Sequence, residues 1–408
     1  MRVLIAGGGI AGMATAMALE RVGVEAAIFE AYEESAGLEA GAYLTIAVNG
    51  LDALRAIGAR QRVLEAGFPT RTIRFQSGTG KHLGDVPIGG TLADGTVTHT
   101  IKRSDLYSVL SDEVRRRGVV LEHGKKLASA REVDDKVVAR FADGSEATGD
   151  LLVGAEGIHC RARQLIDPSA PTPHHTGLGN IGGFARVESV HLEAETFLMV
   201  WGKRAFFGAT PSPDGEIWWF ANPPSERELS RTELASMSAE IWKRRLIELF
   251  SVDKSPAAEI IRATEGSLVG TNQYDLPHVR TWRRDRMVII GDAAHAAAPA
   301  SGQGASMAIE DAVVLAKSLR ETPSVTAALA TYEAVRRPRV ERVVEYGARF
   351  SGAKAPGTVS RIVRDLMLPF VFKRAASPKS KRSMSWLFDY HIRWDEPLHA
   401  AAREAGGS

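Results

Sequence analysis

The chain opens with apolar positions whose spacing changes from that of a strand to that of a helix and back. Residues 2–6 form a short apolar run, residues 10–22 carry small and apolar side chains at helical spacing, and residues 24–29 form a second run that ends in Glu30. Short apolar runs indicate buried strands, and recurrence every three to four residues indicates a helix. The opening therefore predicts a strand–helix–strand unit of a parallel sheet.

Between residues 167 and 280 the pattern changes to short, aromatic-rich apolar segments separated by turn residues. Closely spaced short strands with turn signals between them are typical of an antiparallel sheet. They occupy residues 197–201, 205–209 and 216–221. This region predicts a second domain inserted into the first, and residues 231–250 predict a helix within it.

The pattern of the first domain returns after this insertion. Residues 287–290 have the composition of a buried strand, and helical spacing follows over residues 305–319 and 325–350. The two ends of the chain are therefore expected to build one domain.

Composition narrows the class of function. Hydrophobic residues make up 44% and charged residues 25% of the 408-residue chain, and the net charge of +2 lacks the basic excess expected of a nucleic-acid-binding protein. The single cysteine, Cys160, excludes an intramolecular disulfide, and the glycines that interrupt the N-terminal apolar run differ from a signal peptide, so a cytoplasmic location is expected. No apolar stretch reaches the roughly 18 residues of a membrane span, and the scattered histidines predict no metal site.

A glycine-rich turn joins the first strand to the first helix. The segment Gly7-Gly8-Gly9-Ile10-Ala11-Gly12 fits the pattern G-x-G-x-x-G. In this pattern the glycines allow a tight turn, close approach of a pyrophosphate and close helix–strand packing, and the helix N-terminus attracts the phosphates. Glu30, at the end of the next strand, can accept hydrogen bonds from a ribose. The pattern predicts a dinucleotide site and leaves both NAD and FAD open.

A second ligand loop lies near the other end of the chain. A carboxylate at the carboxyl end of a strand suits the hydroxyls of a sugar-like chain, and glycines before a helix allow a ring to approach the positive helix end. The loop contains, in order, Gly291, Asp292, Pro299, Gly302, Gln303, Gly304 and Ala305.

Together these motifs resemble those of the class A FAD-dependent monooxygenases, the para-hydroxybenzoate hydroxylase-like family. Residues 150–163 resemble the family's Asp-Gly motif, with Glu156 where the family usually has Asp and Cys160 where it commonly has Ser. Residues 103–106 resemble its Arg-x-x-Leu element. The resemblance covers roughly residues 1–345. It predicts an α/β fold with a Rossmann-like FAD-binding domain, an inserted antiparallel β-sheet substrate domain and C-terminal helices.

The domain boundaries follow from the same patterns. The FAD-binding domain is expected to be discontinuous, with some sheet segments of residues 70–100 on the substrate side. The expected parts are residues 1–166 and 281–350 for the FAD-binding domain, 167–280 for the substrate domain and 351–408 for a helical tail.

The resemblance implies non-covalently bound FAD, NADPH or NADH as electron donor, and O₂. It implies that a flavin C4a-hydroperoxide hydroxylates or epoxidises an aromatic or polycyclic small molecule. The implied cofactor-binding residues are Gly7, Gly9, Ile10, Ala11, Gly12, Glu30, Arg103, Glu156, Gly291, Asp292, Gly304 and Ala305. The catalytic flavin-ring loop, acting through its backbone, comprises Pro299, Gly302, Gln303 and Gly304. Arg163 is expected to support the Glu156 loop by ion pairing, and His295 to be structural.

The substrate is expected between the inserted sheet and the flavin. Alternation along a strand puts Trp218 and Phe220 on one face and Trp219 on the other, without indicating which face is inward. The candidate lining residues are Tyr43, Thr45, Trp201, Phe207, Trp218 and Phe220. Other flavin chemistry remains open, notably Baeyer–Villiger-type oxidation, as does a non-catalytic flavin-binding protein. Halogenation is disfavoured because residues 218–223 do not match the Trp-x-Trp-x-Ile-Pro element. The sequence leaves the substrate and the oligomeric state undetermined.

Overall fold

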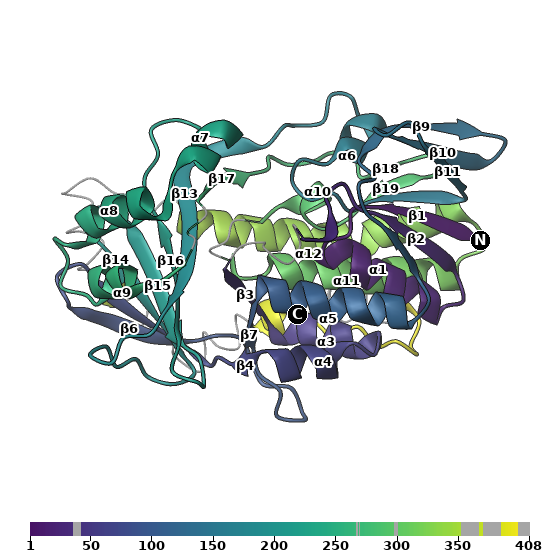
Figure 1. The fold of residues 1–408 in the computed structure, drawn as a ribbon. Helices are drawn as coiled ribbons and strands as arrows, with labels where there is room; N and C mark the ends of the chain where they lie inside the picture. Colours follow the sequence, from purple (N-terminus) through teal and green to yellow (C-terminus); the bar gives the residue numbers. More distant parts are fainter. Residues whose placement is uncertain are drawn as a thin grey trace.

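A computed structural model describes residues 1–35, 42–266, 268, 270–297, 301–351, 367–369 and 385–398. At its centre is a six-stranded sheet that is parallel except for its edge strand β18 (Figure 1). In spatial order its strands are β18 (Arg283–Arg284), β19 (Met287–Ile289), β12 (Leu151–Gly154), β1 (Arg2–Ala6), β2 (Glu25–Phe29) and β8 (Val120–Glu122). The two ends of the chain thus pair in one sheet, since β12 lies between β1 and β19.

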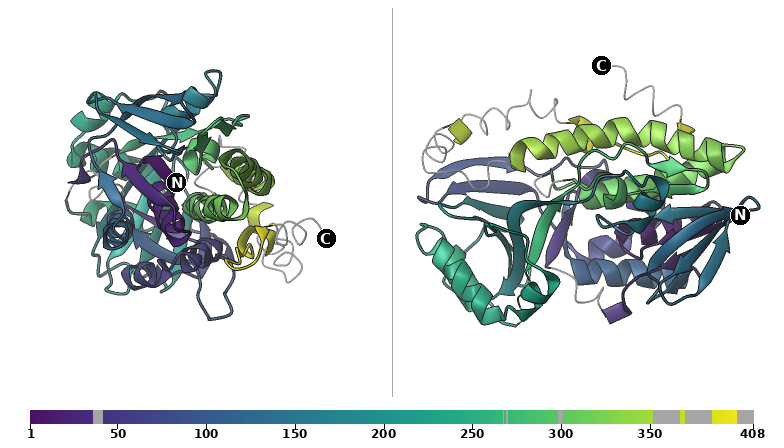
Figure 2. Two further views of the ribbon diagram at one scale, coloured as in Figure 1. Left: turned by 90° about the vertical axis from the view of Figure 1, so that its right-hand side faces the viewer. Right: turned by 90° about the horizontal axis from the view of Figure 1, so that it is seen from above.

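Helices pack on this sheet because its strands are apolar on both faces, as parallel strands usually are. α1 packs along α11, and α11 in turn packs along α12 and α3. Figure 2 shows α12 running from the six-stranded sheet toward the other part of the molecule. The helices of this part of the molecule are α1 (Ile10–Arg21), α3 (Val48–Ala56), α4 (Arg60–Ala66), α5 (Arg103–Arg116), α6 (Arg161–Ile166), α10 (Asp292–His295), α11 (Gly304–Glu321) and α12 (Val325–Ser351).

A seven-stranded sheet forms the second part. It is antiparallel except that β14 and β5 run parallel, a pairing the sequence pattern did not predict. Its strands are β17 (Thr271–Asp275), β13 (His174–Ala185), β16 (Ile217–Asn222), β15 (Phe206–Pro211), β14 (Thr196–Trp201), β5 (Thr72–Ser77) and β6 (His82–Pro87). The helices α8 (Ala239–Phe250) and α9 (Ala257–Ala263) cover the face turned away from the six-stranded sheet (Figure 1).

Two small sheets complete the fold. A meander of β9 (Leu127–Val133), β10 (Lys136–Phe141) and β11 (Glu146–Gly149) flanks the six-stranded sheet, with a turn at Gly144 between β10 and β11. The strands β3 (Tyr43–Ile46), β7 (His99–Lys102) and β4 (Phe68–Pro69) lie between the two large sheets (Figure 1).

The helix expected over residues 231–250 is interrupted. The structure has α7 (Arg231–Ser236) and then α8, because Met237 is extended and the Ser238 side chain accepts a hydrogen bond from the Ile241 nitrogen to cap a new helix. Most of the expected helical tail, residues 351–408, lies outside the described residues. The described segment 385–398 packs against α11 and α12 through bonds such as Lys317 Nζ to the Trp394 carbonyl. No helix in the described part of the chain is long and apolar enough to span a membrane.

Candidate active site

The glycines of the first glycine-rich turn differ in how closely the protein packs around them. Gly7 has a φ of +106°, and a Cβ there or at Gly12 would overlap a backbone oxygen, of Ala155 and of Gly7 respectively. A Cβ at Gly9, by contrast, would have no atom of the described residues within 4 Å. Gly7 and Gly12 therefore allow the strand and helix to pack, whereas Gly9 leaves space at the N-terminus of α1 for a ligand.

Glu30 turns back toward this turn. Its Oε2 accepts a hydrogen bond from the Gly8 nitrogen at 2.6 Å, and its Oε1 accepts one from the Tyr32 nitrogen at 2.9 Å. The half-buried carboxylate is thus fixed beside the glycine turn, at the place where a ribose hydroxyl could donate to it.

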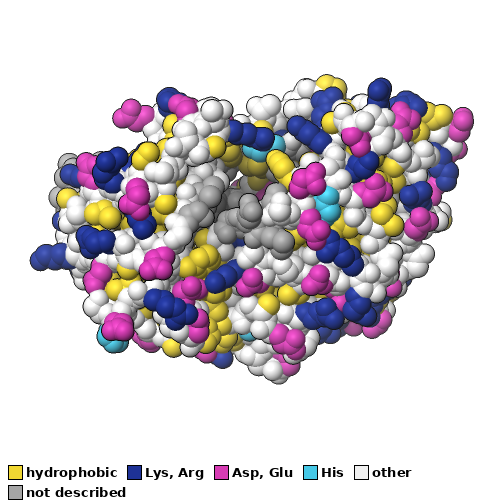
Figure 3. All heavy atoms as spheres, in the orientation of Figure 1, with side chains coloured by type: hydrophobic (Ala, Val, Ile, Leu, Met, Phe, Trp, Pro, Cys, Tyr) yellow, Lys and Arg dark blue, Asp and Glu magenta, His cyan; other side chains and the backbone are white. Residues whose placement is uncertain are grey.

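The second motif meets the first. Gly291, with a φ of +58°, lies so close to α1 that a Cβ there would be 3.1 Å from the Ala11 Cβ. The next residue, Asp292, is exposed, yet desolvation by the surrounding protein raises its pKa, against the attraction of His295 and Arg103. Figure 3 shows the surface hollowed into a cleft between the two parts of the molecule.

The predicted site residues of all the motifs differ in exposure. Gly7, Gly12, Gly291 and Gln303 are buried. Those that remain exposed or half-buried are Gly9, Ile10, Ala11, Glu30, Arg103, Glu156, Asp292, Gly302, Gly304 and Ala305. Pro299 lies outside the described residues.

The third motif supports the other two. The Glu156 Oε2 accepts hydrogen bonds from the Ala162 nitrogen at 2.9 Å and the Cys160 Sγ at 3.0 Å, so this carboxylate caps the start of α6, and burial raises its pKa. Arg163, almost fully buried, donates to the carbonyls of Ile158 and Ala293 at 2.7 and 3.0 Å. Arg163 therefore joins the third motif to the second through carbonyls; the expected ion pair with Glu156 does not form.

Two adjacent acids on α11 were missed by the sequence analysis. The Asp311 Oδ2 accepts from the Gly291 nitrogen at 2.8 Å and lies 2.5 Å from the His295 Nε2. Arg336 bridges both acids, with Nε 2.7 Å from Asp311 Oδ1 and Nη1 2.7 Å from Glu310 Oε2. Burial opposes ionisation of Asp311, but His295 and Arg336 hold its pKa at about 2. The only sequence signal was a pair of acids inside an apolar helical pattern.

One face of the seven-stranded sheet has aromatic side chains that pack against β3. Tyr43 of β3 is 5.7 Å from Trp218 and 6.3 Å from Phe220, measured between ring centroids. Its hydroxyl is buried without a partner among the described residues, and burial raises its pKa. Thr45 lies on the same strand, and its Oγ1 would be 3.9 Å from a Cβ built on Gly302. Trp201 packs with Phe206 at the far end of this face.

Phe207 does not join these residues, contrary to the prediction. Its ring is fully buried on the opposite face, where it packs against Trp219 and Phe250 of α8. Alternation along β15 and β16 therefore directs Trp218 and Phe220 toward the cleft, and Phe207 and Trp219 toward the helices.

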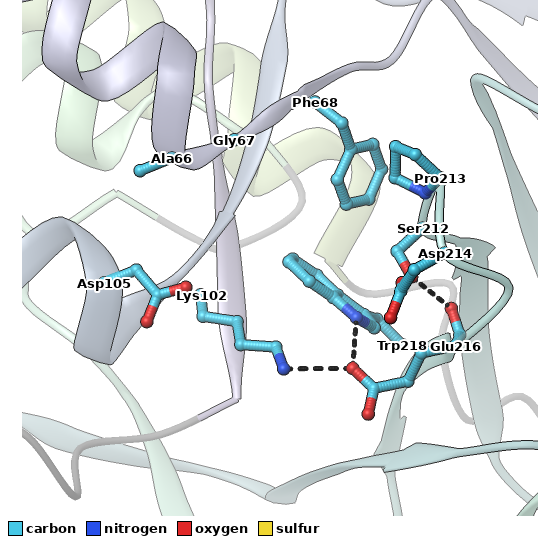
Figure 4. Close-up of a pocket in the computed structure, with 10 residues that line it drawn as sticks. All are labelled: Ala66, Gly67, Phe68, Lys102, Asp105, Ser212, Pro213, Asp214, Glu216 and Trp218. Carbon is cyan, nitrogen blue, oxygen red and sulfur yellow. Dashed lines mark hydrogen bonds and ion pairs between the residues drawn. The ribbon is translucent and has the colours of Figure 1, made fainter.

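A polar pocket of about 270 Å³ adjoins this aromatic face (Figure 4). Glu216 Oε2 accepts from both Lys102 Nζ and Trp218 Nε1 at 2.9 Å, and the Lys102 ammonium lies 4.3 Å from the Phe184 ring centroid. The lining residues are Ala66, Gly67, Phe68, Lys102, Asp105, Ser212, Pro213, Asp214, Glu216 and Trp218.

These features fit a flavin dinucleotide. The open helix end at Gly9 suits a pyrophosphate, Glu30 a ribose, and Asp292 the hydroxyls of a sugar-like chain. Within the described ranges, no three His, Cys, Asp or Glu side chains are grouped so that they could hold a metal ion.

Comparisons with known proteins agree with this geometry. Residues 1–346 match the family model described as FAD binding domain. The chain is 34% identical over 351 residues to aurachin C monooxygenase/isomerase of Stigmatella aurantiaca, covering 85% of this chain and 87% of that protein. It is 31% identical over 357 residues to 3-amino-4-hydroxybenzoate 2-monooxygenase of Streptomyces platensis, covering 84% and 85%.

The fold is also similar to that of a solved structure, Klebsiella pneumoniae HpxO complexed with FAD and uric acid. The TM-score is 0.80 at 24% identity, with 94% of this chain and 97% of that chain covered. This similarity supports the fold, and the family match supports the cofactor. The chain therefore belongs to the FAD-binding-domain family and is a class A FAD-dependent monooxygenase.

Proposed function

We propose that the protein uses NADPH or NADH and O₂ to hydroxylate or epoxidise an aromatic or polycyclic small molecule. The observation that supports this most directly is the packing of Trp218 and Phe220 against β3, whose Thr45 lies beside Gly302. A flat, apolar substrate would lie between this face and the flavin ring. Relatives named for aurachin C and for an aminohydroxybenzoate support the same substrate class.

The side chains bind and orient rather than react. Gly9 and the N-terminus of α1 would hold the pyrophosphate of FAD, Glu30 the adenosine ribose, and Asp292 the ribityl chain. Arg103, whose charge attracts Asp292, would lie at the flavin side. Bound FAD supplies the redox chemistry and the transfer of one oxygen atom from O₂.

The remaining task of the protein is to exclude water from the reacting atoms. Trp218 and Trp201 are almost fully buried, and the Tyr43 hydroxyl is screened from solvent. A dry, aromatic wall favours oxygen transfer to the substrate over loss of the oxygen to water.

The first experiment is an anaerobic titration of the purified flavoprotein with NADPH or NADH, with and without a panel of aromatic compounds. Bleaching of the flavin absorbance that is faster with one compound, followed by incorporation of labelled oxygen from O₂ into that compound, is the expected result. Bleaching without label in any product would refute oxygen transfer and favour another flavin oxidation. Flavin that no nicotinamide reduces would refute the proposed donor.

A further inference from the structure

Residues 385–398, which we call the C-terminal strap, lie across four helices of the FAD-binding domain and outside the matched part of the family, residues 1–346 (Figure 2). The strap joins α1, which begins after the glycine turn, to α11, which begins in the second ligand loop. It contacts each helix through a charged side chain. These contacts are Arg21 of α1 over the Trp394 ring, Asp52 of α3 with His391, Lys317 of α11 with the Arg393 carbonyl, and Arg339 of α12 with the Trp386 carbonyl.

A buried lysine of α11 fixes the backbone of the strap. The Lys317 side chain is 1% exposed, and its Nζ donates to the carbonyls of Arg393 and Trp394 at 2.9 and 2.8 Å. It also donates to the Glu396 carbonyl. An ammonium group has three donors, and burying it without acceptors is costly, so the strap supplies one acceptor for each donor. If the strap moved away, Lys317 would keep only its ion pair with Glu321, at 3.3 Å, among these contacts.

The middle of the strap packs on the arginines that hold the two buried acids of α11. The Tyr390 ring centroid is 4.0 Å from Arg339 Cζ and 5.5 Å from Arg336 Cζ. Arg339 donates to both oxygens of Glu310 at 2.8 Å, and Arg336 bridges Glu310 and Asp311. A ring packed on the face of a guanidinium leaves its N–H groups free to donate in the plane. Tyr390 therefore restricts both arginines to positions from which they reach the acids.

The acids connect these arginines to the cofactor site. Asp311 accepts from the nitrogen of Gly291, the residue before Asp292, and Glu310 accepts from Asn49 Nδ2 of α3 at 2.7 Å. Both acids are fully buried, so an arginine that moved with the strap would leave a buried carboxylate with too few partners. The turn at Gly291 and the docking of the strap therefore depend on the same cluster of charges.

We propose that the C-terminal strap controls the affinity for FAD. Docking of residues 385–398 favours the shape of the Gly291 turn that binds the cofactor, and bound FAD favours docking of the strap. Linkage requires the two effects to be equal in size. The proposal rests on FAD as the cofactor of the family and on no particular substrate, so it is tested without turnover.

Substitutions at Tyr390 test the first direction of this coupling. Tyr390→Ala removes the ring from both arginines, and Tyr390→Phe is the matched control because it keeps the ring. The FAD dissociation constant of each apoprotein is measured by flavin fluorescence. Tyr390→Ala is expected to bind FAD at least about fivefold more weakly, and Tyr390→Phe as tightly as the wild type. Wild-type affinity in Tyr390→Ala, or an equal loss in both variants, would overturn the proposal.

A substitution far from the ligand loop releases the strap from its other end. Lys317→Met, in the C-terminal half of α11, removes the cation that the three strap carbonyls share. It is expected to weaken FAD binding, and adding Tyr390→Ala should weaken it no further, because either change releases the same strap. Lys243→Met on α8 is the control and should bind FAD as the wild type does. Losses that multiply in the double variant, or a loss in the control, would overturn the proposal. Where Lys317→Met fails to fold, the two Tyr390 variants decide.

Hydrogen exchange of the wild-type chain tests the reverse direction. The backbone amides of residues 385–398 are followed in the apoprotein and in the protein saturated with FAD, with the amides of α8 as the reference for unfolding of the whole chain. FAD is expected to slow exchange in the strap at least about fivefold more than in α8. Exchange that FAD slows equally in both segments, or in neither, would show that the strap only adds stability and would overturn the proposal.

Discussion

The carboxylate of Asp311 accepts a hydrogen bond from the backbone nitrogen of Gly291 at 2.8 Å, although 20 positions separate the two residues. The same carboxylate pairs with His295 and Arg336. A fully buried acid on α11 thus fixes the strained turn, with φ +58° at Gly291, that presents Asp292 to the cleft. The shape of the flavin loop depends on a residue that lies behind it.

Replacing Asp311 by Asn is expected to lower the free energy of unfolding of the apoprotein by about 3 kcal/mol at neutral pH. The amide oxygen can still accept from Gly291, but Arg336 loses a buried partner, and breaking a buried ion pair typically costs about 3–5 kcal/mol. Urea titrations of both proteins measure the difference. The exposed Asp112→Asn on α5 is the control and should change stability by less than about 0.5 kcal/mol.

The pH dependence of that difference has a definite sign. The folded pKa of Asp311, about 2, lies below its ordinary value of 3.8, so the stability it contributes is complete above the ordinary value and is lost as the pH falls toward 2. The gap between the wild type and Asp311→Asn should therefore stay constant from about pH 7 to about pH 5 and narrow below about pH 4. A gap that widens on acidification would contradict the assignment.

Alanine substitutions at two glycines of one motif should affect different properties, FAD affinity at Gly9 and stability at Gly12. Gly9→Ala adds a methyl at a φ of −78°, where no atom in the described part of the chain lies within 4 Å. The apoprotein should therefore keep its stability while FAD binds at least about tenfold more weakly. Gly12→Ala forces a methyl against the Gly7 oxygen and should cost at least about 1–3 kcal/mol of stability. Thermal unfolding of the apoproteins and FAD titrations measure both effects. Equal losses of stability would contradict the division of roles.

The motifs of the cofactor site could be predicted because their signals are local. A strand, a glycine turn and a helix follow each other within Arg2–Arg21, and the strand before Asp292 is equally close to its loop. Such segments identify a ligand turn before any long-range contact is known. Gly9 is exposed, whereas Gly7 and Gly12 are buried, so the three glycines of one motif differ in surroundings.

Other parts of the site depend on packing between distant segments. Asn49 and Glu310 lie in helices whose patterns are simply apolar and polar, and their link appears only when α3 packs on α11. Alternation along β16 separates its side chains into two faces but does not show which face is turned toward the cleft. The packing of α8 and α9 over Trp219 decides this. The parallel pairing of β14 with β5 likewise joins segments that are far apart in sequence.

The two faces of the sheet give a paired prediction. Phe207→Ala empties a fully buried site against α8 and should cost about 3–5 kcal/mol of stability, with the KM for an accepted substrate unchanged below the unfolding temperature. Phe220→Ala, on the half-buried face beside Tyr43, should destabilise less and raise that KM at least about tenfold. Denaturant titration and steady-state kinetics distinguish them. If only Phe207→Ala raised the KM, the substrate would bind on the face of the sheet that α8 and α9 cover, which would contradict the proposed site.

Replacing Asp292 by Asn should raise the stability of the apoprotein and weaken FAD binding. Desolvation raises its folded pKa above the ordinary value, so at neutral pH its charge destabilises the apoprotein, and Asp292→Asn should be more stable than the wild type. The stability difference between the variant and the wild type should shrink as the pH falls through the raised folded pKa. It should vanish below the ordinary pKa, where the carboxyl is neutral in both the folded and the unfolded state. The same variant should bind FAD at least about tenfold more weakly, since an amide oxygen accepts hydrogen bonds from hydroxyls less strongly than a carboxylate does. Urea titrations across this pH range, paired with FAD titrations at neutral pH, measure both effects. An apoprotein that is less stable than the wild type at neutral pH would show that Asp292 serves the fold rather than the ligand.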